Sequence, residues 1–205
     1  TVYESSFLGF VMAALAAGLL SVVFATLTLI FLANQVAAGL AVGILGLGVS
    51  ALIGKKHEGF TIEPLKNVDW GFLTDIPVVG RILFQHDLVL YVGILLIAVL
   101  WFVLTRTKLG LIIKAVGEAP EAAHAIGYPV ILIRFLAVAF GGAMAGMGGA
   151  YLTLAYTPLW AEGLVAGRGW IAVALVVFGS WRAHRVALGA YLFGAISLLE
   201  LSIQG

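Results

Sequence analysis

The sequence contains no cysteine and few charged residues, and both absences restrict what the protein can be. Without cysteine it has no disulfide framework, no thiol nucleophile and no cysteine-based metal site. Charged residues make up 10% of the chain and hydrophobic residues 62%, whereas a soluble domain carries roughly 25% charged residues. The chain therefore cannot cover a water-exposed surface. We expect it to lie in a bilayer, where apolar side chains face lipid and backbone groups pair internally.

The apolar residues come in long charge-free runs, which are typical of transmembrane helices rather than of the alternating strands of a barrel. The longest run, residues 5–54, contains no Asp, Glu, Lys or Arg. Since one span needs about 20 apolar residues, this run predicts two helices separated by the polar pair Asn34-Gln35. The sequence thus predicts an all-α fold, a polytopic bundle of transmembrane helices.

We treat residues 1–205 as part of a single transmembrane domain. The predicted spans are 7–32, 36–53, 88–105, 131–156, 169–181 and 186–203. The uncharged core of the fifth is only about 18 Å long at 1.5 Å per residue, too short to cross alone, so we expect a short or broken helix there. The chain starts without Met or a basic leader and stops as an apolar segment ends. We therefore expect a piece of a longer membrane protein.

The charged residues are concentrated in loops. Segment 55–87 mixes acids, bases and two prolines, and 106–129 is a polar loop. Lys and Arg in short loops mark the cytoplasmic side. The basic residues near short loops are Arg106, Lys108, Lys114, Arg134, Arg182 and Arg185. This distribution predicts that 106–129 is cytoplasmic and that 55–87 is an outer loop.

The most informative part of the polar loop is a short Ala-rich helix that contains Glu121-Ala-Ala-x-x-x-Gly127. We expect Glu118 to begin this helix, Pro120 to occupy its first turn, where a missing N–H costs nothing, and Gly127 to end it. Such a slim helix can enter a groove on a soluble partner. The residues expected to make that contact are Gly117, Glu118, Pro120, Glu121, Ala122, Ala123 and Gly127. An ordinary capped surface helix is the alternative, because charge patterns usually mean solvation.

Asn34 and Gln35 are the polar pair that interrupts the longest apolar run. If the chain is a transporter, they are the candidates for the solute path. Amides inside an apolar run can hydrogen-bond sugar hydroxyls or a nucleobase, and transporters often break helices where the solute binds. The alternative is a cytoplasmic turn in which water solvates both amides.

Two pairs of glycines four residues apart, Gly39 with Gly43 and Gly142 with Gly146, are candidates for close helix packing. Small residues at this spacing let the backbones of membrane helices approach each other. Alternatively, these glycines could lie where two helices move against each other or line a pore. The histidines are scattered over different loops without the spacing of a metal site, and no basic cluster points to nucleic acid.

Three stretches resemble a known family. The Glu121–Gly127 string resembles the cytoplasmic coupling motif of ATP-binding-cassette (ABC) importer permeases. The wider run 114–127 is similar to the version in the permeases for sugars, nucleosides and branched-chain amino acids. Residues 32–48 and 167–182 resemble the simple-sugar and nucleoside branch. The chain departs from that branch at Ala33, where a basic residue is expected, and at His184, just after the second stretch, where the branch often has Pro.

The resemblance implies a transport subunit rather than an enzyme, in the plasma membrane of a bacterium or archaeon. Two permease subunits would form the pore, and each coupling helix would dock on an ABC ATPase, which would hold ATP and Mg. An extracytoplasmic solute-binding protein would deliver a simple sugar or nucleoside, or alternatively a branched-chain amino acid. This chain would bind no cofactor, and it has no Walker A sequence. Helices of the family would be missing at both ends.

Two other classes remain as alternatives. A self-contained secondary transporter or channel predicts ionisable residues in the middle of spans. The central parts of 7–32, 36–53, 88–105 and 135–156 contain none. An intramembrane enzyme would need acids, histidines or a nucleophile gathered at one depth, and the sequence shows no such group.

Overall fold

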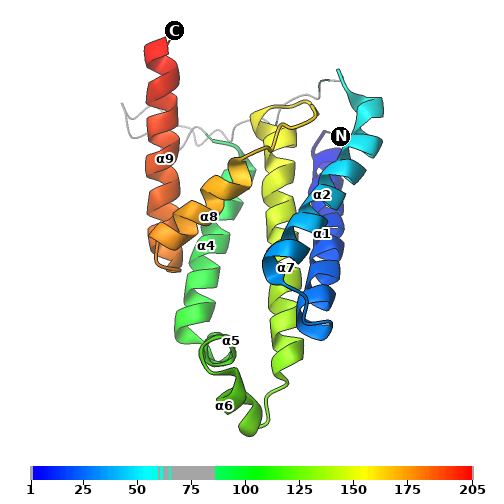
Figure 1. Cartoon of the computed structure of the whole chain (residues 1–205). Coiled ribbons are helices and arrows are strands. Elements are labelled where there is room, and N and C mark those ends of the chain that lie inside the picture. The colour runs from blue at the N-terminus through cyan, green and yellow to red at the C-terminus, as the bar shows by residue number, and fades with distance from the viewer. Residues whose placement is uncertain (1, 60, 62–64, 66–85, 205) are drawn as a thin grey trace. The chain divides into compact units, whose positions relative to one another are not determined.

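The computed structural model describes residues 2–59, 61, 65 and 86–204 (Figure 1). Most of the predicted outer loop 55–87 lies outside these residues. The described elements are α1 (Val2–Ala25), η1 (Thr26–Ile30), α2 (Gln35–Gly54), η2 (Lys55–His57), α4 (Leu88–Arg106), α5 (Lys108–Glu118), α6 (Pro120–Ala125), α7 (Val130–Tyr151), η4 (Leu152–Tyr156), α8 (Arg168–Phe178) and α9 (Ala183–Gln204).

The described residues form helices and no strand of a sheet, which confirms the predicted all-α class. Four helical rods in this part of the chain are long and apolar enough to cross a membrane: Ser6–Ile30, Gln35–His57, Leu88–Arg106 and Val130–Tyr156. The predicted short helix is also present, because α8 is an apolar helix of 11 residues. It ends at Phe178, earlier than the predicted 181.

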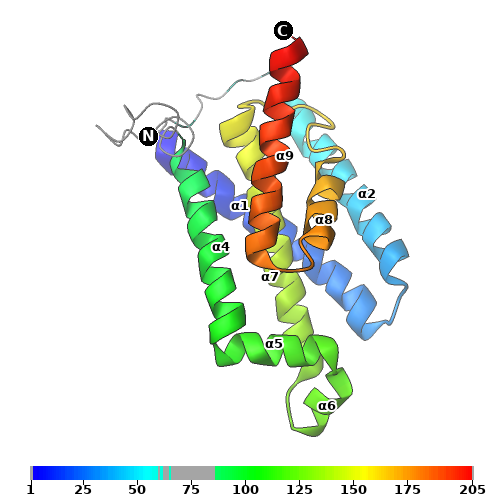
Figure 2. The same cartoon turned by 90° about the vertical axis from the view of Figure 1, so that its left-hand side faces the viewer.

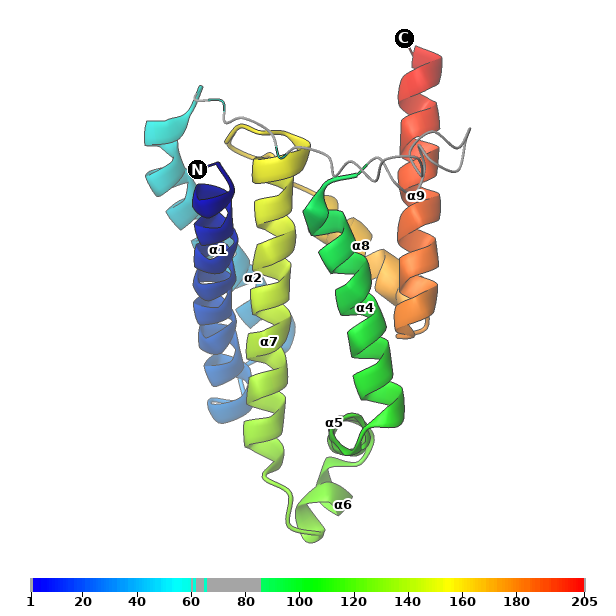
Figure 3. The same cartoon turned by 180° about the vertical axis from the view of Figure 1, so that it is seen from behind.

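The chain divides into two compact units, residues 1–87 with 112–164 and residues 88–111 with 165–205. The core of the first unit is the pair α1 and α7, which lie side by side (Figure 3). Gly146 of α7 faces Ala13 and Ala17 of α1, and Gly142 faces Ala17 and Ser21. Residue numbers fall along α7 as they rise along α1, so the two helices are antiparallel.

Two of the rods end in a π-helical turn that the sequence did not predict, η1 after α1 and η4 after α7. Threonine hydroxyls bond backbone carbonyls here: Thr26 donates to Val22 at 2.8 Å, and Thr28 donates to Phe24 at 2.9 Å. Such bonds compete with the regular helical ladder and often bend helices. The turns lengthen α1 and α7 by five residues each.

The two ends of the first unit differ in what they contain. The turn from α1 to α2 lies at the end of the α1–α7 pair where α7 begins, and α6 lies beyond that same end (Figure 1). At the opposite end Trp160 packs so closely on Gly54 that no larger residue would fit there. The hydroxyl of Tyr151 also donates to Asp87 at 2.8 Å at this end.

The second unit contains α4, α8 and α9, with α9 contacting both of the others. A tight turn joins α8 to α9. Ser180 and Trp181 adopt φ of 53° and 59°, a left-handed conformation that is uncommon for residues other than glycine. Gly179 lies against Val186, and its amide bonds the carbonyl of Leu175 at 2.8 Å. This turn reverses the chain and ends α8 before Ser180.

Candidate coupling site

The predicted coupling loop, residues 106–129, begins at the corner between α4 and α5. The Thr107 hydroxyl accepts a hydrogen bond from the Gly110 amide at 3.3 Å, and the Thr107 amide donates to Val103 at 3.3 Å. A Cβ atom on Gly110 would collide with the backbone of Val103 and Leu104. Glycine at this position therefore permits the sharp change in chain direction.

α5 is amphipathic. Val116 is 2% exposed and Ile112 is partly buried, whereas Lys114 and Glu118 are exposed to solvent. Because residues three or four apart share a helix face, Ile112 and Val116 mark the buried side of α5. The charged side remains open, and α5 leads into α6 (Figure 2).

The expectation that Glu118 begins the coupling helix is wrong, because Glu118 is the last residue of α5. The Ala119 amide still donates to the Ala115 carbonyl at 2.9 Å, so α5 is helical up to this point. Pro120 has no amide hydrogen and cannot extend α5. It instead occupies the first turn of α6, with Ala119 as the N-cap at φ −138°.

α6 is a short helix with a well-formed C-terminal cap. The Tyr128 amide donates to Ala123 at 3.1 Å, and the Gly127 amide donates to His124 at 2.9 Å. These two bonds make a Schellman motif, which requires a left-handed residue after the helix. Gly127 supplies it at φ +93°. The chain is thereby turned toward α7.

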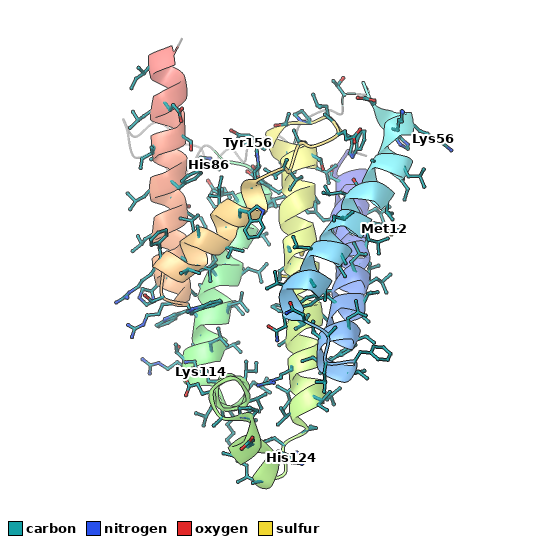
Figure 4. The ribbon with its side chains drawn as sticks, in the orientation of Figure 1. Met12, Lys56, His86, Lys114, His124 and Tyr156 are labelled. Carbon is teal, nitrogen blue, oxygen red and sulfur yellow. The ribbon has the colours of Figure 1, made fainter. Side chains whose placement is uncertain are left out.

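Most of α6 is exposed. Ala123 is 2% exposed and anchors the helix, while Glu121, Ala122 and His124 are open to solvent. Ile126, just past the helix, is 71% exposed. His124 lies at the outer tip of the loop (Figure 4). The result is a narrow protrusion with an acidic first turn, small alanines and one exposed apolar side chain, a shape that suits insertion into a groove of another protein.

The predicted solute pair lies at the start of α2 rather than in its middle, and Gln35 is the first residue of that helix. Asn34 is the N-cap of α2, and its side-chain oxygen accepts from the amides of Val36 at 3.0 Å and Ala37 at 3.1 Å. Both Asn34 and Gln35 are exposed, at the end of the first unit that carries α6. A role in the solute path therefore stays a prediction.

We expect Asn34→Ala to destabilise the protein by about 1 kcal/mol, because two amides of α2 lose their acceptor. A change of this size lowers the melting temperature by about 2–4 °C in a chain of this length. Asn34→Ser keeps an N-cap oxygen and is the matched control. Unchanged melting combined with weaker solute binding in the alanine variant would contradict the capping role.

The glycine pairs have different surroundings. Gly142 and Gly146 lie directly against α1, where an added Cβ would overlap Ser21 and the backbone of Ala13. A Cβ on Gly39 would touch Phe24 at 3.7 Å, and a Cβ on Gly43 would meet no described atom within 4 Å. In the described residues the pair on α7 is therefore the one in close helix contact.

α6 is thus a solvent-exposed helix that follows one apolar rod in the chain, Leu88–Arg106, and precedes another, Val130–Tyr156. The chain belongs to the family described as branched-chain amino acid transport system / permease component, whose model matches residues 2–203. That match includes both compact units. The chain is a multi-pass protein of the plasma membrane.

Several curated proteins are similar to the chain. A putative glucose ABC transporter permease of Haloferax volcanii is 43% identical over 189 residues, covering 90% of this chain and 57% of that protein. The guanosine ABC transporter permease NupQ of Bacillus subtilis is 37% identical over 204 residues, covering 95% and 62%. The nucleoside permease NupC of Lactococcus lactis is 35% identical over 130 residues, covering 63% and 41%.

The chain therefore spans at most about three fifths of the length of these relatives. No solved structure matches it.

Proposed function

We propose that the protein is the permease subunit of an ABC importer that moves a simple sugar or a nucleoside across the plasma membrane. The observation that carries this proposal is α6, an exposed, Schellman-capped helix in the segment that joins two apolar rods along the chain. The named relatives are permeases for glucose, guanosine and nucleosides, which supports a polar solute of that size.

In this proposal α6 docks on a separate ATPase subunit that binds ATP and Mg. Binding and hydrolysis of ATP move that subunit, and α6 passes the motion to the membrane helices. A second permease subunit completes the pore, and an extracytoplasmic binding protein delivers the solute. The coupling contact consists of the exposed side chains of Glu121 and Ala122 with their neighbours, held in place by the turn at Gly127.

The test is uptake into proteoliposomes that contain the full-length protein with its ATPase and second permease. We expect uptake of radiolabelled glucose or guanosine that requires ATP on the ATPase side and a loaded binding protein. Leucine is the control for the branched-chain alternative. An assembly that contains a hydrolysis-deficient ATPase should give no uptake. Uptake of equal rate without ATP, or driven by an ion gradient, would contradict the proposal.

A further inference from the structure

The backbone carbonyl of Val116 cannot make the hydrogen bond that an uninterrupted helix would give it. In an α-helix each carbonyl accepts from the amide four residues later, and four residues after Val116 comes Pro120, which has no N–H. Val116 is 2% exposed, so water is a poor substitute. The sequence that ends α5 thus creates a buried acceptor in need of a donor.

Arg134 supplies that donor. Its Nη2 atom lies 3.3 Å from the Val116 carbonyl oxygen, and the two residues are 18 positions apart in the chain. Arg134 is partly buried and lies near the start of α7. A cation is also favoured at the C-terminal end of a helix by the helix dipole, and charged donors form the stronger hydrogen bonds. The contact therefore fastens the end of α5 to α7.

Both ends of α6 consequently lead to the same helix. At its start, the joint before Pro120 is held to α7 by Arg134. At its end, Gly127 turns the chain, and Pro129 is the N-cap of α7. α7 in turn packs against α1 through Gly142 and Gly146. A displacement of α6 is thus passed to the α1–α7 pair from two points instead of one.

We infer that Arg134 is a positioning residue for transport, which transfers the movement of the coupling helix to α7. This inference rests on the proposed function. Without the Arg134 contact the chain is free to pivot between Glu118 and Pro120, so α6 would move with its partner while α7 lags behind. ATP hydrolysis would continue, but less solute would cross the membrane for each ATP.

The first measurement is the number of ATP molecules hydrolysed per solute taken up, in proteoliposomes that contain the full-length protein and its ATPase. Arg134→Met removes the donor but keeps a long side chain, and we expect this ratio to rise about fivefold, the lower range of couplings between sites. Arg134→Lys keeps a charged donor and should stay closer to the wild type. Amounts in the membrane and co-purification of the ATPase should not change.

The second measurement does not depend on transport. In the full-length protein, hydrogen–deuterium exchange of the amides of residues 116–119 should be about tenfold faster in Arg134→Met, the effect of losing about 1.4 kcal/mol. Lys114→Met, on the exposed side of the same helix (Figure 4), should leave the exchange rate unchanged. If Arg134→Met does not accumulate, Arg134→Gln is measured instead and should give intermediate values.

The outcomes separate the two proposals. Unchanged exchange in Arg134→Met would overturn the link itself. Faster exchange with an unchanged ratio of ATP to solute would make the bond merely structural and overturn its role in transport. A wild-type assembly that takes up no solute with ATP would contradict the proposed function, and the exchange rates alone would then decide whether Arg134 holds α5 to α7.

Discussion

Replacing both Gly142 and Gly146 with alanine should separate α1 from α7 and sharply reduce the amount of folded protein. A Cβ atom on Gly142 would overlap Ser21, and one on Gly146 would lie 2.6 Å from the Cβ atom of Ala17. Overpacking of this kind costs about 1–3 kcal/mol at each site, while the better helix propensity of alanine returns at most about 1 kcal/mol. Thermal unfolding in detergent, followed by size-exclusion chromatography, measures the loss.

The matched control for this variant lies on the same helix. A Cβ atom on Gly141 or Gly148 would meet no described atom within 4 Å, so Gly141→Ala/Gly148→Ala makes the same chemical change without the same overlap. We expect its melting temperature to equal or exceed that of the wild type. If the two double variants melt at the same temperature, close packing of α7 on α1 does not hold the first unit together.

The all-α class could be predicted because the apolar residues come in long runs without charges, and a bilayer sets the length of a helix that crosses it. Residues 5–54 contain no charge, so only a polar break could divide them, and the break fell at Asn34. The π-helical turns at Thr26–Ile30 and Leu152–Tyr156 could not be predicted in this way. They leave the apolar runs unchanged in length and composition, and hydropathy does not distinguish a π-helical turn from an α-helical one.

The boundaries of α6 were predicted in part, while its coupling role stays a prediction. Gly127 could be assigned because a left-handed turn after a helix favours glycine strongly, and the structure has φ +93° there. Glu118 was misassigned because the alanines and acids around Pro120 suit one helix as well as two. Pro120 could have indicated two helices, because a proline cannot extend α5 but can occupy the first turn of α6.

The sequence analysis used Arg134 only as one of the basic residues that mark the cytoplasmic side of the membrane. Its contact with Val116 joins residues 18 positions apart, and no local pattern encodes such a pair. The absent amide of Pro120 does predict that the Val116 carbonyl needs a donor from elsewhere. Which side chain provides it depends on how α7 packs beside α5, and tertiary structure alone determines that.

Reversing the charge of α6 and placing a bulky residue in the turn at its C-terminal end should greatly reduce transport without unfolding the spans. Glu121 lies in the first turn of α6, where the helix dipole favours a carboxylate. Its side chain is also part of the exposed surface that α6 would present to a partner. In the double variant Glu121→Lys/Gly127→Trp, a bulky residue at φ +93° costs about 1–2 kcal/mol and redirects the chain. We expect ATP-driven uptake to fall at least about tenfold, as with a coupling loss of about 1.4 kcal/mol or more.

The control for the turn is Gly127→Asn, because asparagine tolerates the left-handed conformation that tryptophan resists. This variant should retain most of the uptake, whereas Gly127→Trp alone should lose much of it. Equal uptake in Gly127→Asn and Gly127→Trp would show that the Schellman turn does not position α6. Uptake at the wild-type rate in the double variant would mean that α6 is not the element through which ATP hydrolysis moves the membrane helices, since α6 would then have lost its charge and its direction with no effect on transport.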